Sequence, residues 1–120
     1  MLKVYYITLA TRHTVIEKQG VTPRMSPLRP GFWHPKGHVI YLADSIKTAK
    51  QYADKAYFMR YTDAKAWDVY EVVYEEFPPD MHGDYEWGIP GVFYITVPIA
   101  RENLRFIETY YAVKVERVRR

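Results

Sequence analysis

The side chains of this sequence that are best suited to chemistry are aromatic and basic. Tyr, Phe and Trp make up 17% of the 120 residues, and twelve of them are tyrosines. Aromatic surfaces stack on planar rings such as nicotinamide, adenine or nucleic-acid bases, and they also pack well in a β-rich core. Composition alone does not choose between these uses.

Polar candidates follow the first predicted strand. Arg12 and His13 lie where a cleft is expected and could meet a pyrophosphate, but they are equally typical of a solvated helix start. A second pair, His34 and His38, is separated by Pro-Lys-Gly, which gives no helical ligand spacing, so we expect no metal site. The sequence has no cysteine, which excludes disulfides and thiolate chemistry.

Two segments are basic, on a chain with a formal net charge of +3. One is the proline-rich loop at residues 24–36, and the other is the C-terminus with Lys114, Arg117, Arg119 and Arg120. Both could bind nucleic acid through its phosphates. For the C-terminal residues, a solubilising tail is the simpler interpretation.

Hydrophobic patterning predicts the elements that must position these side chains. Alternation predicts strands over residues 3–9, 38–43, 66–74, 92–97 and 105–118. One helix is predicted after Thr11 or Thr14, ending at Gly20. A second begins after Asp44 and Ser45 and carries apolar residues at helical spacing: Ile46, Ala49, Tyr52, Ala53 and Ala56. Residues 25–36 and 77–91 are predicted loops, and the whole is predicted to be a single α+β domain over residues 1–120.

Four blocks, in order, resemble the catalytic core of poly(ADP-ribose) polymerases and related ADP-ribosyltransferases. The most specific is K-G-H-V-I-Y-L-A-D-S at residues 36–45, similar to the family's I-Y-F-A-D strand and the helix after it. The others are Y-Y-I-T with Q-G-V at residues 5–8 and 19–21, V-Y-E-V at 69–72, and Y-I-T with I-A and N-L-R-F at 94–96, 99–100 and 103–106. The resemblance implies the family fold of split antiparallel β-sheets with two short helices.

The resemblance also implies NAD as a substrate. An ADP-ribosyltransferase breaks the nicotinamide–ribose bond through an oxocarbenium-like transition state, so it must hold the nicotinamide and the ribose and present a carboxylate. By this resemblance Tyr41 and Tyr52 would sandwich the nicotinamide, and the Thr48 hydroxyl would bind its carboxamide. The remaining implied NAD contacts are Tyr6, Thr8, Arg12 and His38.

Three positions depart from the family pattern. Tyr6 replaces the family's His, and Ile7 replaces a Gly where the backbone approaches the nicotinamide. A phenol can still hydrogen-bond to a ribose hydroxyl. Phe93, or Val92 with a one-residue slip, stands where a Glu is expected, and Glu86 is the nearest acidic substitute. The implied catalytic residues are therefore Tyr6, Tyr41 and Glu86.

Two functions remain open at this point. One is a mono-ADP-ribosyltransferase that transfers a single ADP-ribose from NAD to a protein or nucleic acid. The other is a degenerate transferase fold kept as a binding module or inhibitor, such as a phage or mobile-element protein that docks on a host protein. The sequence begins M-L-K without a signal-peptide core and has no membrane-spanning apolar run, so we expect a cytoplasmic protein.

Overall fold

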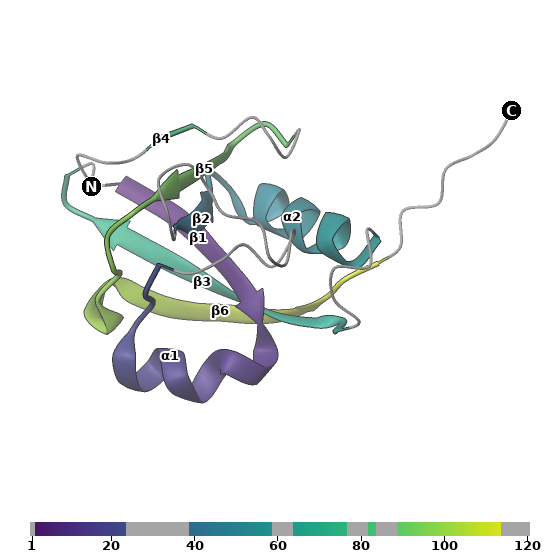
Figure 1. Cartoon of the computed structure of the whole chain (residues 1–120), viewed down its shortest axis with the longest axis horizontal. Helices are drawn as coiled ribbons and strands as arrows, with labels where there is room; N and C mark the ends of the chain where they lie inside the picture. Colours follow the sequence, from purple (N-terminus) through teal and green to yellow (C-terminus); the bar gives the residue numbers. More distant parts are fainter. Residues whose placement is uncertain (1, 24–38, 59–63, 77–81, 84–88, 114–120) are drawn as a thin grey trace, which may run out of the picture.

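Strands outnumber helices in the part of the chain that the structure describes. The computed structural model describes residues 2–23, 39–58, 64–76, 82–83 and 89–113. Its strands are β1 (Leu2–Leu9), β2 (Ile40–Ala43), β3 (Ala66–Tyr74), β4 (His82–Gly83), β5 (Val92–Ile95) and β6 (Leu104–Tyr111). Its helices are α1 (His13–Gln19) and α2 (Ile46–Phe58), with two single turns, η1 (Ala10–Arg12) and η2 (Arg101–Asn103) (Figure 1).

All strand pairs are antiparallel, and the strands form one sheet in the order β4-β5-β2-β1-β3-β6. The predicted α+β class with two short helices is confirmed. The split into two sheets that the family resemblance implies is not observed, because the described strands join into a single sheet. The join is thin, however: β1 and β2 share the one register pair Tyr5–Ala43, while β1 pairs with β3 along its whole length.

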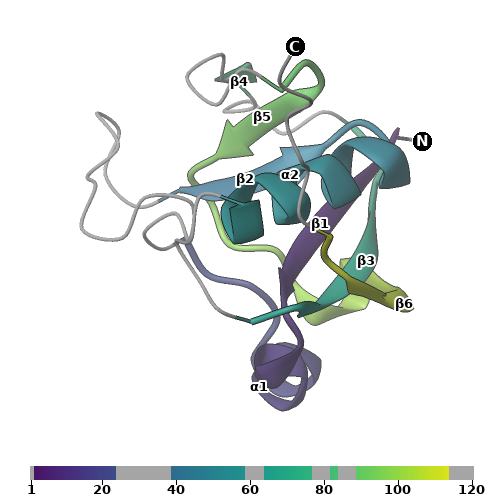
Figure 2. The same ribbon diagram turned by 90° about the vertical axis from the view of Figure 1, so that its right-hand side faces the viewer.

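The two helices cover opposite faces of this sheet (Figures 1 and 2). Because side chains alternate along a strand, β1 sends neighbouring residues to different faces. Val4 and Tyr6 pack in the core under α1, whereas Ile7 packs in the core under α2. This alternation decides which side chains can share a site.

Helix α2 begins where the cap residues predict. The Ser45 hydroxyl accepts a hydrogen bond from the Thr48 backbone N–H at 3.1 Å, the bond expected of an N-cap. The face toward the sheet is the predicted one, with Ala49, Tyr52 and Ala53 buried. These small alanines allow the helix to lie close to β1 and β2 (Figure 2).

Helix α1 ends at Gly20, as predicted. Gly20 has φ +73° and ψ −154°, a conformation that is almost confined to glycine. A Cβ at this position would overlap the Ile99 carbonyl oxygen, because Val21 and Ile99 form a β-bridge immediately beyond the helix. This bridge anchors the end of α1 to the sheet-side residue Ile99.

The remaining differences from the predicted elements are small. The short strand β4 lies inside the predicted loop at residues 77–91, because a two-residue strand is too short to show an alternating pattern. The last strand, predicted over residues 105–118, ends at Tyr111 in the structure, and the described residues Ala112 and Val113 lie beyond it. In the described residues no helix has the length and apolar character needed to cross a membrane.

Candidate functional site

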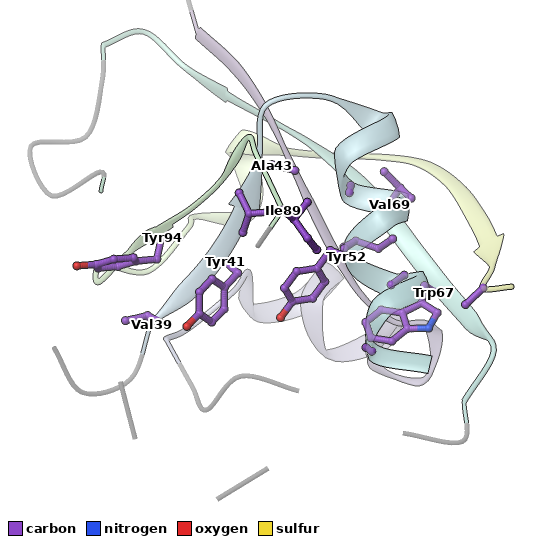
Figure 3. Packing of buried hydrophobic residues seen from close by; sticks show 14 residues of the cluster. Val39, Tyr41, Ala43, Tyr52, Trp67, Val69, Ile89 and Tyr94 are labelled. Carbon is purple, nitrogen blue, oxygen red and sulfur yellow. The ribbon is translucent and has the colours of Figure 1, made fainter. Parts of the chain in front are cut away.

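Tyr41 and Tyr52, which the resemblance implies as the nicotinamide sandwich, lie next to each other between β2 and α2. Figure 3 shows the Tyr41 ring projecting from β2 and the Tyr52 ring projecting from α2 toward it. The ring centroids are 6.0 Å apart and the planes are inclined by 36°. A planar ring between two others needs about 7 Å, twice the ~3.5 Å contact distance of carbon atoms, and parallel planes. The two tyrosines therefore pack as a direct aromatic pair.

A small cavity lies beside this pair. Its lining includes Tyr5 and Ile7 of β1, Tyr41, Tyr52 and, from β5, Val92. Its volume is about 10 Å³, which is room for about one water molecule. Small-molecule sites are typically about 300–1,000 Å³. Ile7, the residue that replaces the family's Gly, is among the side chains that fill this space.

Thr48 is engaged within its own helix. Its backbone N–H and its hydroxyl both contact the Ser45 hydroxyl, at 3.1 Å and 3.0 Å. The residue is 9% exposed. Thr48 thus contributes to the cap that starts α2, in addition to any role toward a ligand.

Tyr6 and Thr8 lie on the opposite face of the sheet from Tyr41 and Tyr52. Tyr6 packs in the α1-face core, and Thr8, two residues further along β1, points to the same side. The structure therefore places Tyr6 and Tyr41, which the resemblance implies as two catalytic residues of one site, on opposite faces of the sheet. The β1 side chains that border Tyr41 are instead Tyr5 and Ile7.

The position expected for a catalytic carboxylate is apolar on both faces. Phe93 packs against the α1-face core, and Val92 lines the small cavity under α2. The substitute Glu86 lies outside the described residues, as do His38, the basic loop at 24–36 and the C-terminal residues Lys114, Arg117, Arg119 and Arg120.

Two rows of side chains cross the sheet on the α1 face. Thr8 of β1 pairs with Asp68 of β3, which pairs with Thr109 of β6. One step along, Tyr6 pairs with Tyr70, which pairs with Phe106. Antiparallel register therefore places a buried carboxylate and a buried phenol side by side in the middle of the sheet.

Two basic side chains at the start of α1, Arg12 and His13, contact these rows. The Arg12 guanidinium donates to the Tyr6 hydroxyl at 3.2 Å and to the Thr8 hydroxyl at 3.5 Å. His13 Nδ1 lies 3.0 Å from Asp68 Oδ2 and 2.9 Å from the Tyr70 hydroxyl. These contacts connect the start of α1 to two strands, β1 through Arg12 and β3 through His13.

Each nitrogen of the His13 ring meets a carboxylate. Nε2 lies 2.8 Å from Glu17 Oε1, one helical turn away, while Nδ1 meets Asp68. Thr109 donates to the other Asp68 oxygen at 2.8 Å. A carboxylate only accepts hydrogen bonds, so an imidazolium with two N–H groups satisfies both, whereas a neutral ring donates to only one.

Tyr70 is held in its protonated form by its surroundings. Burial raises the pKa of its phenol well above the ordinary value, and the charges of Asp68 and Glu17 act in the same direction. The Tyr70 hydroxyl is therefore a neutral hydrogen-bonding group at physiological pH. It can donate to His13 or accept from it, depending on the state of the imidazole.

One feature of the sequence, the acidic residue Asp68 within a predicted strand, points to this network. Asp68 is the one acidic residue in the first half of an otherwise apolar and aromatic strand, A-W-D-V-Y. A carboxylate on a buried strand needs a partner. Its partner is His13, which lies 55 positions earlier in the chain. Neither residue spacing nor composition predicts that these two residues meet.

An open groove of about 490 Å³ runs beside the network, between α1, η2 and β6. We call it the α1 groove. Its apolar and aromatic lining residues are Ile16, Tyr70, Leu104 and Phe106, of which Ile16 and Tyr70 are buried. Its charged residues are Glu17, Arg101 and Glu102.

In the described residues no group of three potential ligands could hold a metal ion. Although His13 contacts both Glu17 and Asp68, the two carboxylates lie at different ring nitrogens and cannot share one ion with it. Comparison with protein-family models, with curated proteins and with solved structures gave no significant match. The likeness to ADP-ribosyltransferases thus rests on the four sequence blocks.

Proposed function

We propose that this chain is a divergent ADP-ribosyltransferase-like domain that serves as a binding module for another protein. One observation carries the proposal: in the described residues, the cavity lined by Ile7, Tyr41 and Tyr52, where the resemblance implies nicotinamide, has a volume of about 10 Å³. Ile7, Tyr41 and Tyr52 occupy the space with their own side chains. The domain would keep the fold of the transferases and bind its partner protein through its surface.

The placement of the other implied NAD residues supports this proposal. On the far face of the sheet, Arg12 donates hydrogen bonds to the hydroxyls of Tyr6 and Thr8. The apolar residues Val92 and Phe93 occupy the position where positive charge on the ribose would need a carboxylate.

A mono-ADP-ribosyltransferase is the second candidate. It is favoured by the gathering of Tyr41, Tyr52 and Ile7 around one cavity, as the resemblance implies for the nicotinamide site. For NAD to bind there, the two tyrosine rings would have to separate. The reaction would transfer a single ADP-ribose to a protein or nucleic acid.

Nicotinamide and NAD titrations distinguish the two candidates. With ¹⁵N-labelled protein, we expect neither ligand at millimolar concentration to shift the amide signals of Ile7, Tyr41 or Tyr52, and neither to raise the melting temperature. Ile7→Gly removes the side chain that stands in place of the family's Gly and should admit nicotinamide, with shifts at Tyr41 and Tyr52.

Val69→Ala is the matched control, because it also removes buried volume from this core but does not line the cavity. It should destabilise the protein without admitting nicotinamide. Saturable shifts at Tyr41 and Tyr52 in the unmodified protein, accompanied by transfer of label from NAD, would establish the transferase and exclude the binding module as the primary function.

A further inference from the structure

The α1 groove combines aromatic lining residues with exposed carboxylates. Phe106 contributes a ring that is 44% exposed, although it also contacts the His13 ring edge-on at 5.3 Å between centroids. Beside it on β3 lies the protonated phenol of Tyr70, which is 2% exposed and meets the Phe106 ring edge-on at 5.7 Å between centroids. An aromatic face bordered by carboxylates attracts cations.

The charges of the groove favour a basic occupant. Glu17 and Glu102 contribute two negative charges and Arg101 one positive charge, so the lining is acidic on a chain whose formal net charge is +3. Glu102 stays ionised, because its own backbone N–H and the Arg101 guanidinium lower its pKa.

Both carboxylates keep capacity for a further donor. Glu17 contacts His13 through Oε1, and Glu102 contacts Arg101 through Oε1. A carboxylate offers two oxygens and about four acceptor positions. Side-chain exposures of 62% for Glu17 and 72% for Glu102 mean that a ligand loses little solvation in reaching them.

We propose that the α1 groove binds an arginine or lysine side chain presented by a partner protein. The aliphatic stem would lie on Leu104, and the charged group would lie over Phe106 within reach of Glu17 and Glu102. This inference rests on the proposed function as a binding module and names the chemistry of the partner. It uses the face of the sheet opposite the Tyr41–Tyr52 pair.

The test is a titration of ¹⁵N-labelled protein with N-acetyl-arginine amide and N-acetyl-lysine amide. The corresponding glutamine and glutamate amides are the uncharged and acidic probes. We expect the two basic amides to shift the signals of Ile16, Tyr70, Leu104 and Phe106 in a saturable way. The neutral and acidic amides should leave those signals in place.

Substitutions in the groove should change the affinity for the basic amides in opposite directions. Glu17→Gln and Glu102→Gln should each weaken binding by about two- to five-fold, the range of an exposed ion pair. Phe106→Ala should weaken it by a similar factor through loss of the ring. Arg101→Gln should strengthen it, because it removes the groove's positive charge. Glu76→Gln, an exposed carboxylate at the end of β3, is the control and should have no effect.

Three results would overturn the proposal: no shift of the groove signals with either basic amide, stronger shifts with the acidic amide, or weaker binding of arginine amide to Arg101→Gln. Groove signals that change with protein concentration alone, together with faster sedimentation, would put a second copy in the groove and also overturn it. Shifts at Ile7, Tyr41 and Tyr52 with NAD would contradict the proposed function instead, and the two failures are thus distinguishable.

Discussion

His13 is the residue whose role changes most between sequence and structure. From the sequence it is a polar residue at a helix start, whereas in the fold it joins α1 to the middle of the sheet through Asp68 and Tyr70. Its two carboxylate partners differ in burial. The side chain of Asp68 is 4% exposed and that of Glu17 is 62% exposed. The contact of the imidazole with the buried Asp68 therefore matters for stability, whereas water can replace its contact with the exposed Glu17.

Replacement of His13 by alanine should lower the free energy of unfolding by about 1–3 kcal/mol, because it leaves the buried Asp68 carboxylate with one fewer donor. Glu17→Gln, which disturbs only the exposed contact of the ring, should cost about 0.5 kcal/mol or less. Urea unfolding followed by circular dichroism measures both. Equal losses for the two variants would show that the Asp68 contact is no stronger than the exposed one.

Gly20 offers a second prediction at this scale. Gly20→Ala should destabilise the protein by roughly 1–3 kcal/mol from backbone strain alone, since the conformation is almost exclusive to glycine. The overlap of the new Cβ with the Ile99 carbonyl adds to this. Thermal unfolding of this variant beside Gln19→Ala, an exposed neighbour, checks the prediction, and a melting temperature unchanged in both would contradict it.

At the scale of elements, Asp54 connects α2 to the end of β6. Its carboxylate accepts hydrogen bonds from the Tyr110 hydroxyl at 2.8 Å and from the Val113 backbone N–H at 2.9 Å. Burial raises the pKa of Tyr110 to about 12, and the hydrogen bond to Asp54 and its charge act in the same direction. The Asp54 carboxylate thereby holds α2 against the end of β6, although the two elements are far apart in sequence.

This raised pKa makes stability fall in alkaline solution. An unfolded tyrosine ionises near pH 10, so the contribution of Tyr110 is complete below about pH 10 and is lost as the pH rises toward about 12. Tyr110→Phe should remove that part of the pH dependence and leave a shallower decline from the other tyrosines. Urea midpoints measured across this pH range test it, and identical slopes in the two proteins would refute the assignment.

Element patterns were predictable from the sequence, but the face on which each side chain lies was only partly so. Alternation placed β3 over its observed residues, and the Ser45 cap and Gly20 stop fixed one end of each helix. The family blocks, in contrast, implied that Tyr6 and Tyr41 belong to one catalytic site, whereas the two side chains lie on opposite faces of the sheet. Because strand side chains alternate, a one-residue shift in such a comparison moves a residue to the other face. The contact between His13 and Asp68 depends on tertiary register, which no local pattern contains.

At the scale of the whole molecule, the sheet is strongly paired on one side and weakly paired on the other. Strand β3 lies between β1 and β6 and is paired with both along most of its length. On the other side, β5 pairs with the four-residue strand β2 and the two-residue strand β4. The Tyr5–Ala43 pair alone connects β1 with β2.

Native-state hydrogen exchange should reveal this difference. Amides of β3, such as those of Val69 and Val72, should exchange only through global unfolding, whereas amides of β5 should exchange through openings of lower free energy. Mass spectrometry or NMR under native conditions measures the two groups. Equal protection of β3 and β5 would show that the sheet opens as one unit.

The thin junction at Tyr5–Ala43 has a consequence for how such a protein can change over evolutionary time. One side of the sheet is built from β1, β3 and β6, and the other from β2, β4 and β5, so the two sides alternate along the chain. No continuous stretch of sequence encodes either side alone. Exchange of a single continuous gene segment therefore cannot replace one side of the sheet and leave the other intact.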